Sequence, residues 1–215
     1  MNNSEFYCLL IHYDEIATKL GNRNWFEKKL TKNIRNQIDG LEYSKVQRFA
    51  GRVFVNDIDY LQKDVYINRI KKVMGVSSAH IMLSIPASID LIMKKSIDIL
   101  KSNKNNFNTF KVLTKRQNKS FDKKSQEVNH DVGDLIRSTF SKQVKLKDPD
   151  LEFRIEIVDD MAFLGFQQVK GYGGLPVGTE ENALSLISSG IDSPVASFKM
   201  LKRGIQLSYI HFHSY

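Results

Sequence analysis

Residues 186–195 read Leu186-Ile187-Ser188-Ser189-Gly190-Ile191-Asp192-Ser193-Pro194-Val195, and this stretch decides the fold of the C-terminal part of the chain. The apolar run 183–187 that leads into it is typical of a buried strand. Pro194 suits the first turn of a helix because its φ is fixed and it has no N–H to satisfy. We therefore predict a helix over 195–203 and a second strand over 207–212.

A strand-helix-strand unit of this kind offers an anion site at the start of its helix. The first backbone N–H groups of a helix have no partner within it, and the helix dipole favours negative charge there. Ser188, Ser189, Gly190 and Ser193 are small enough to let a phosphate group approach. Taken alone, the loop also fits a plain strand-to-helix turn in another α/β domain, and that alternative stays open at this point.

The N-terminal part of the chain has a different pattern of elements. Strands are predicted over 6–12, 43–49, 52–55 and 77–85, with helices over 25–38 and from about 59 to just before Gly75. Asn24 is the expected N-cap of the first helix. The expected apolar face of the second helix is Leu61, Val65, Ile70 and Val73. The order β-α-β-β-α-β is ferredoxin-like, a common fold that says little about function.

The middle of the chain is predicted to contain further helices and strands. Helices are expected over 87–100 and from Ser125, and strands over 110–114, 151–158 and 161–169. Residues 171–178 form a glycine-rich connector to the C-terminal unit.

The net charge of +8 is concentrated in this middle part. Residues 101–147 hold 12 Lys and Arg against 4 Asp and Glu, together with several phenylalanines. Basic charge with interleaved aromatic residues suits a nucleic-acid backbone. A solvated, lysine-rich surface would have the same composition, so charge alone does not decide between the two.

Several classes of protein are excluded by the rest of the composition. No apolar run approaches the roughly 18 residues of a membrane span, and the N-terminus lacks the regions of a signal peptide, so we expect a cytoplasmic protein without a membrane partner. The one cysteine, Cys8, excludes a disulfide framework and a cysteine-based zinc site. His211 and His213 alternate along a predicted strand without a third ligand, so no metal site is predicted from them.

The loop resembles the pyrophosphate loop of the ATP pyrophosphatase superfamily, whose pattern is Ser-Gly-Gly-x-Asp-Ser. Ser188, Gly190, Asp192 and Ser193 match this pattern, and Ser189 stands where the first glycine belongs. If that position needs a positive φ, serine costs on the order of 1 kcal/mol of backbone strain there.

Three further features resemble one family, the tRNA 4-thiouridine synthetases. Gly21-Asn22-Arg23 is similar to part of the family's N-terminal segment. Lys115-Arg116 and Lys119-Ser120-Phe121 look like part of its THUMP domain, an RNA-binding module. Gly173-Gly174-Leu175-Pro176-Val177-Gly178-Thr179 looks like its connector to the pyrophosphate loop.

The resemblance implies α+β ferredoxin-like and THUMP domains, followed by the first β-α-β unit of an α/β ATP pyrophosphatase (adenine nucleotide alpha hydrolase-like) domain. We expect the ferredoxin-like domain at 1–75 and the THUMP domain at 76–170, with a signature that begins near 61. The connector and a truncated ATP pyrophosphatase domain are expected at 171–215. One β-α-β unit needs more strands to close a core, so we expect a fragment of a longer enzyme.

The resemblance also implies an activity. A uridine carbonyl oxygen in tRNA is adenylated by ATP with release of pyrophosphate, and a persulfide sulfur then displaces AMP to give 4-thiouridine. Many relatives also supply sulfur for thiamine thiazole synthesis. Asp192 is the implied catalytic residue, which fixes the loop geometry or a Mg²⁺ ion.

The implied binding residues fall into two sets. ATP is expected at the loop and at the ends of the two strands, on Leu186, Ile187, Ser188, Ser189, Gly190, Asp192, Ser193, His211 and Phe212. The tRNA is expected on the basic segment, at Lys111, Lys115, Arg116, Lys119, Lys123 and Lys124.

The remaining partners and the alternatives follow from what the sequence contains near the loop. No cysteine lies there, so sulfur transfer needs a thiol that the family carries further along the chain and a persulfide donor of the cysteine desulfurase type. A homodimer is among the expected assemblies. One alternative is a non-catalytic THUMP-type tRNA-binding protein whose loop is degenerate at Ser189. Another is an ATP pyrophosphatase that acts on a different RNA base or on a small molecule.

Overall fold

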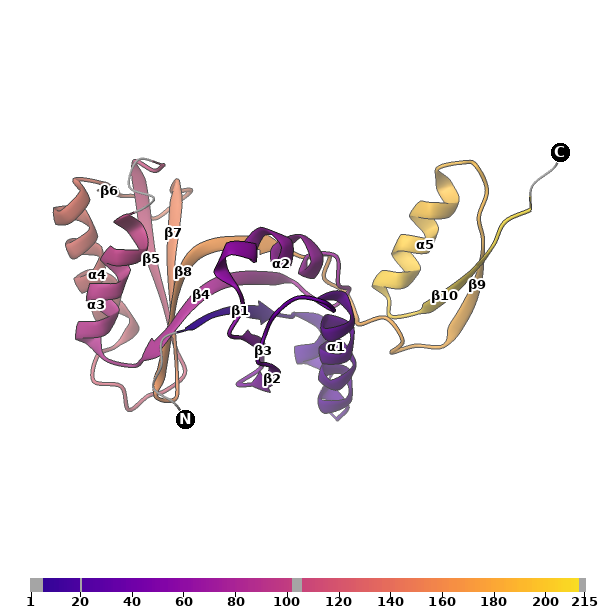
Figure 1. Cartoon of the computed structure of the whole chain (residues 1–215), viewed down its shortest axis with the longest axis horizontal. Helices are drawn as coiled ribbons and strands as arrows, with labels where there is room; N and C mark the ends of the chain where they lie inside the picture. Colours follow the sequence, from indigo (N-terminus) through magenta and orange to yellow (C-terminus); the bar gives the residue numbers. More distant parts are fainter. Residues whose placement is uncertain (1–5, 20, 102–105, 213–215) are drawn as a thin grey trace. The chain divides into compact units, whose positions relative to one another are not determined.

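The chain contains both strands and helices in the computed structural model, which describes residues 6–19, 21–101 and 106–212 (Figure 1). The chain divides into two units. Unit 1 consists of His80–Gln167 with the start of the chain up to Cys8, and unit 2 consists of Leu9–Ala79 with the residues from Gln168 onward. Within the described ranges, no helix has the length and apolar character needed to cross a membrane.

The first elements follow the predicted β-α-β-β-α-β order. They are β1 (Phe6–His12), α1 (Arg23–Gln37), β2 (Lys45–Phe49), β3 (Arg52–Asn56), α2 (Lys63–Ile70) and β4 (Ser78–Pro86), with short 3-10 turns η1 (Glu15–Thr18) and η2 (Tyr60–Gln62). In unit 2 the strands are hydrogen-bonded in the order β2-β3-β1. α1 buries Phe26, Leu30 and Ile34, which recur at the spacing of one helix face.

Two details of this region differ from the sequence predictions. Asn22 precedes α1, and Asn24 lies within the helix, where its side chain accepts a hydrogen bond from Arg48 at 2.6 Å. In the second helix Leu61 is 91% exposed, and Val65 is also exposed. Asp59 caps η2 through the Leu61 N–H, so Leu61 lies in a 3-10 turn and α2 begins only at Lys63. The other two residues of the predicted face, Ile70 and Val73, are buried.

Arg23 joins α1 to neighbouring elements of unit 2. Its Nε donates to Glu27 Oε1 at 2.9 Å, and its Nη2 donates to the Tyr13 hydroxyl at 2.9 Å. Burial, with the hydrogen bond to Glu27, raises the pKa of Tyr13 to about 12. Gly51 has a φ of +72°, and a Cβ there would lie 2.6 Å from Arg23 Nη2, so the turn between β2 and β3 leaves room for the guanidinium.

Unit 1 packs two helices on one side of a sheet. Its elements are α3 (Ile89–Lys101), β5 (Thr109–Arg116), α4 (Ser125–Phe140), β6 (Gln143–Val144), β7 (Leu151–Val158) and β8 (Met161–Lys170). The strand order is β8-β7-β5-β6, with β5 parallel to β7 and β7 antiparallel to β8. Phe110 and Phe153 on the sheet pack with Val132 and Ile136 of α4, and Figure 1 shows α3 and α4 on the same side of the strands.

α4 begins at Ser125, as predicted, and the structure shows how its first turn is capped. Lys124 precedes the helix, so Glu127 is the third helical residue, and its carboxylate accepts a hydrogen bond from the Lys124 N–H at 2.6 Å. This is the backbone-directed half of a capping box. The negative charge of Glu127 also suits the positive end of the helix dipole.

Replacing Gly133, inside α4, with alanine is expected to stabilise the fold by about 0.5–1 kcal/mol, because alanine has a higher helix propensity. A Cβ there would meet Val112 Cγ2 at 4.0 Å, an ordinary contact. Gly165→Ala is the opposite control, since its Cβ would lie 2.2 Å from the Ile81 carbonyl oxygen. Urea unfolding measures both, and a Gly133→Ala variant less stable than the parent contradicts the expectation.

Candidate functional site

The predicted strand-helix-strand unit is present in unit 2. It consists of β9 (Asn182–Leu186), α5 (Asp192–Lys202) and β10 (Gln206–Ile210), and the two strands are parallel with Leu184 opposite Ser208. The helix begins three residues earlier than predicted. Asp192 and Ser193 therefore lie in its first turn, where the N–H groups lack helical partners and an acidic side chain is favoured.

Hydrogen bonds among its own residues hold the loop between β9 and α5. The Ser188 N–H donates to Ser193 Oγ at 3.1 Å, and the hydroxyl oxygens of Ser188 and Ser193 are 3.3 Å apart. The Gly190 N–H approaches Ser188 Oγ at 3.3 Å. Ser188, Ser189, Gly190 and Asp192 are exposed. The loop thus places two adjacent hydroxyls and one carboxylate beside the first N–H groups of a helix, a set of groups that suits a phosphate and its counter-ion.

The backbone strain considered for Ser189 does not occur. Neither Ser189 nor Gly190 is among the described residues with a positive φ. The serine in the glycine position therefore adopts a conformation open to any L-residue. Its remaining effect is steric, because its Cβ and hydroxyl occupy space that glycine leaves open.

The strand ends bring the other four predicted nucleotide-binding residues to the same end of the β9–β10 pair. Ile187 and His211 immediately follow the two strands, and Nδ1 of His211 lies 2.7 Å from the Ile187 carbonyl oxygen. Leu186 is 62% and Phe212 79% exposed, which leaves apolar surface beside the loop. His213 lies outside the described residues, and among those described no group of three His, Cys, Asp or Glu side chains could hold a metal ion.

The glycine-rich connector packs against the other end of α5. The Leu175 N–H donates to the Lys202 carbonyl at 2.9 Å, and the Gly178 N–H donates to the Gly204 carbonyl at 2.8 Å. On its other side, the Val177 carbonyl accepts a hydrogen bond from Asn33 Nδ2 in α1 at 3.0 Å. The connector is therefore a structural brace for the C-terminal end of the helix whose N-terminal end carries the loop.

Unit 1 carries the basic residues predicted to contact RNA, and they divide into two groups. Lys115, Lys119 and Lys124 are exposed and form no ion pair with any residue that the structure describes. Their charges are available to an external polyanion.

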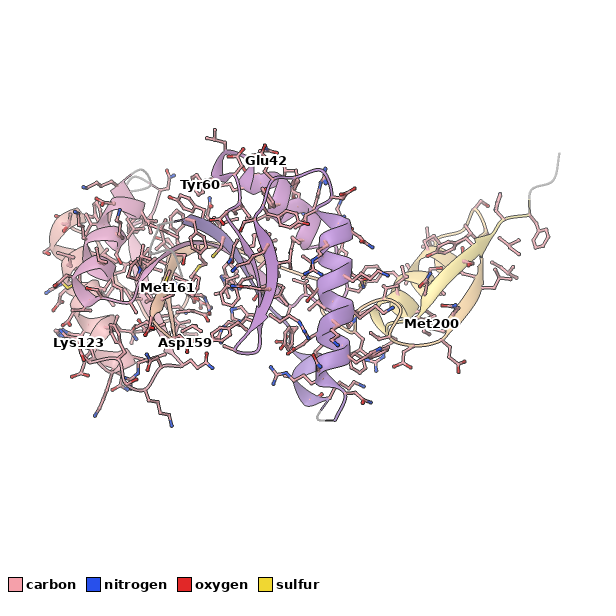
Figure 2. All side chains as sticks on the ribbon, turned by 60° about the horizontal axis from the view of Figure 1, so that its bottom comes forward. Glu42, Tyr60, Lys123, Asp159, Met161 and Met200 are labelled. Carbon is pink, nitrogen blue, oxygen red and sulfur yellow. The ribbon has the colours of Figure 1, made fainter. Side chains whose placement is uncertain are left out.

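The other three basic residues are held by partners within unit 1. Lys111 Nζ lies 2.8 Å from Glu152, and Lys123, labelled in Figure 2, forms an ion pair with Asp131. The hydrogen bond to Asp131 raises the pKa of Lys123. Burial opposes ionisation of Glu152, but the hydrogen bond from Lys111 and the charge of Arg154 outweigh it and lower the pKa of the Glu152 carboxyl. These pairs partly neutralise the charges of Lys111 and Lys123.

Arg116 has a structural role that sequence reasoning did not anticipate. Its Nη1 donates to the carbonyls of Phe121 and Lys123, at 2.8 and 3.0 Å, and so closes the basic loop. Asn118 was also missed. Its Oδ1 accepts from the Ser120 N–H at 2.9 Å, and its Nδ2 donates to the Asp159 carbonyl at 3.0 Å. Asn118 thus shapes the turn that holds Lys119, and an Asn two residues before a serine is the signal that could have indicated it.

Three family models match successive parts of the chain. The ThiI ferredoxin-like domain matches residues 8–79, the THUMP domain residues 86–167, and the thiamine biosynthesis protein (ThiI) model residues 178–215.

Curated relatives match nearly all of the chain. A probable tRNA sulfurtransferase of Thermoanaerobacter sp. (strain X514) is 39% identical over 210 residues, which cover 96% of this chain and 53% of the relative. Another from Moorella thermoacetica is 38% identical, with coverage of 98% and 53%. The chain spans about half the length of the curated relatives it matches.

Solved structures also match nearly all of the chain. A 4-thiouridine synthetase–RNA complex with bound ATP matches with a TM-score of 0.81 and 32% identity, over 97% of this chain and 53% of that one. PH1313 from Pyrococcus horikoshii Ot3 matches with a TM-score of 0.87 and 28% identity, over 97% of this chain and 69% of that one. The loop, the domain order and these matches together mean that the chain belongs to the tRNA sulfurtransferase, or 4-thiouridine synthetase, family.

Proposed function

We propose that this chain contributes tRNA binding and ATP binding to an enzyme that converts a tRNA uridine to 4-thiouridine. The observation that carries the proposal is the Ser188–Ser193 loop at the start of α5, in a chain whose basic segment falls within the THUMP match. The proposed reaction has two steps. A uridine carbonyl oxygen attacks the α-phosphorus of ATP and pyrophosphate leaves. The outer sulfur of a persulfide then attacks the carbon of that carbonyl and AMP leaves; a second thiol breaks the S–S bond, so that the sulfur stays on the uridine and the sulfur carrier becomes a disulfide.

In the first step, we assign the loop to the phosphates of ATP. The Ser188 and Ser193 hydroxyls and the N–H groups at the start of α5 hold the β- and γ-phosphates, where the helix dipole favours negative charge. Leu186, Ile187, His211 and Phe212 border the adenosine. Asp192 and the loop hydroxyls supply the oxygen donors that Mg²⁺ prefers, and that ion would draw charge from the leaving pyrophosphate.

For tRNA, we assign the phosphate contacts first to Lys115, Lys119 and Lys124, which are exposed and lack ion pairs within the described chain. Three further basic residues hold neighbouring segments in place and add positive charge close to the tRNA phosphates: Lys111, Arg116 and Lys123. We assign residues 1–75, 76–170 and 171–215 to the three domains as expected from the sequence. The proposal further includes cytoplasmic location, a cysteine desulfurase-type persulfide donor, a homodimer, and sulfur supply for thiamine synthesis.

Replacing Asp192 with alanine is expected to abolish tRNA-dependent release of pyrophosphate while tRNA affinity stays unchanged. The measurement is pyrophosphate release from ATP by the full-length protein that contains this sequence, with and without tRNA. Asp192→Asn is the matched control, because it keeps the shape of the side chain but removes the charge on which a magnesium contact depends. Release that persists undiminished in Asp192→Ala contradicts the assignment of Asp192.

A second candidate function rests on Ser189, which occupies a glycine position of the loop pattern. If the serine side chain blocks the phosphates, the protein binds tRNA without adenylating it. Ser189→Gly separates the two functions, since it restores the space without changing the RNA surface. Pyrophosphate release that is absent from the parent and restored in Ser189→Gly, with tRNA binding unchanged, shows that the serine side chain blocks the phosphates. Release absent from both, with normal tRNA binding, favours a non-catalytic function with a cause other than Ser189.

A further inference from the structure

The row of hydrogen bonds between β9 and β10 continues beyond the ends of both strands, where the side chain of His211 takes part in it. The Ile187 N–H donates to the Ile210 carbonyl at 2.8 Å, and the Ile187 carbonyl oxygen lies 2.7 Å from Nδ1 of His211. Because a carbonyl oxygen can only accept, Nδ1 must carry the hydrogen. In the neutral ring, Nε2 is then unprotonated. The imidazole takes the place that the next backbone N–H would have in the ladder.

This hydrogen bond acts on the first residue of the phosphate-binding loop. The Ile187 carbonyl and the Ser188 N–H belong to the same planar peptide group, so the direction of one determines the direction of the other. His211 holds the carbonyl end of that group, and Ser193 Oγ accepts from its N–H end at 3.1 Å. Rotation of the peptide plane would break both bonds at once.

We propose that His211 is a positioning residue of the ATP loop, which orients the Ile187–Ser188 peptide group through Nδ1–H. The proposal rests on the proposed function only in that the oriented loop binds the phosphates of ATP. His211 holds the Ser188 N–H and hydroxyl in register with Ser193, so that the loop is ordered before the nucleotide arrives. Less conformational freedom is then lost on binding, which strengthens it.

The tautomer of His211 is the first test, and it needs no nucleotide. A long-range proton–nitrogen NMR spectrum of the chain at about pH 8, where an ordinary histidine is neutral, distinguishes the two ring nitrogens. We expect Nδ1 to be protonated and Nε2 to be bare. His211→Asn assigns the signals by their loss. A ring protonated at Nε2 overturns the proposal.

Two substitutions separate action through Nδ1 from direct contact through Nε2. Asparagine places its amide N–H near the position of Nδ1, whereas glutamine reaches toward the position of Nε2. With MgATP as the probe, we expect His211→Asn to bind within a few-fold of the parent, and His211→Gln and His211→Ala to bind about tenfold more weakly, the effect of one lost hydrogen bond. Retained binding by His211→Gln with loss by His211→Asn overturns the proposal.

The amide signal of Ser188 gives a readout that a general loss of stability would not move. It should keep its position in His211→Asn and shift in His211→Gln while other amides of the unit stay in place. If the full-length parent protein does not bind MgATP, the nucleotide part of the proposed function fails. The tautomer and the Ser188 signal still decide whether His211 orients the loop.

Discussion

Replacing Lys115, Lys119 and Lys124 together with glutamate is expected to weaken tRNA binding by several hundredfold at about 0.1 M salt. Each phosphate contact in duplex nucleic acid contributes roughly 0.9 to the slope of log K against log salt, which is nearly tenfold per contact at this salt concentration. These lysines are exposed and form no ion pair within the described residues, so their charges are not already neutralised.

The measurement is tRNA affinity at several salt concentrations, with the slope compared between variants. The matched control replaces the same three lysines with arginine, which keeps the charge and should keep the slope. Loss of the three contacts should lower the magnitude of the slope by about 2.7, whereas a change in folding would not track salt in this way. An unchanged slope and affinity in the glutamate variant would place the tRNA surface elsewhere.

Replacing Gly174 with alanine is expected to destabilise the fold by about 2–4 kcal/mol, and replacing Gly173 by only about 1 kcal/mol. Both glycines have a positive φ, 65° at Gly173 and 78° at Gly174, so alanine carries the same left-handed penalty at each. They differ in the space around them. A Cβ at Gly173 meets nothing within 4 Å, whereas one at Gly174 would lie 2.2 Å from the Lys202 carbonyl oxygen.

The added cost at Gly174 comes from overpacking against a backbone atom that cannot move aside as a flexible side chain would. Lys202 is the last residue of α5, and its carbonyl accepts the hydrogen bond from Leu175, so the clash would also loosen the brace of the helix. Urea unfolding, followed by tryptophan fluorescence and by circular dichroism, measures both variants. Equal losses of stability would mean that the connector does not pack on α5.

Much of the fold was predictable because its strands have clear hydrophobic patterns. β1 and β7 have the predicted bounds, and the family assignment is confirmed by the matches to all three domain models. Two errors lie at helix starts. Asp59 caps a 3-10 turn through the Leu61 N–H, so α2 begins later than predicted, and α1 begins two residues before its predicted start, so Asn22 rather than Asn24 precedes it. Neither effect is visible in the spacing of apolar residues.

In the candidate site, too, some features could be predicted from the sequence and others could not. The order Ser188, Gly190, Asp192, Ser193 in the sequence predicts small residues at a helix start, and the structure places them there; anion binding by this loop stays a prediction. The sequence could not show that Ser189 is free of strain, since that depends on the φ the folded loop adopts. It also could not show which lysines are paired, because Lys111 and Lys123 meet Glu152 and Asp131 only after strands and helix have packed.

By itself, then, the sequence determined most strands and helices, the residues of the loop and the family, all of which follow from neighbours close along the chain. Only the tertiary structure decided which basic side chains are left without an ion pair among the described residues, why the connector needs Gly174, and that His211 reaches the Ile187 carbonyl. The physical reason is distance along the chain. Ile187 and His211 are 24 residues apart, and only the parallel pairing of β9 and β10 brings their polar atoms within hydrogen-bonding range.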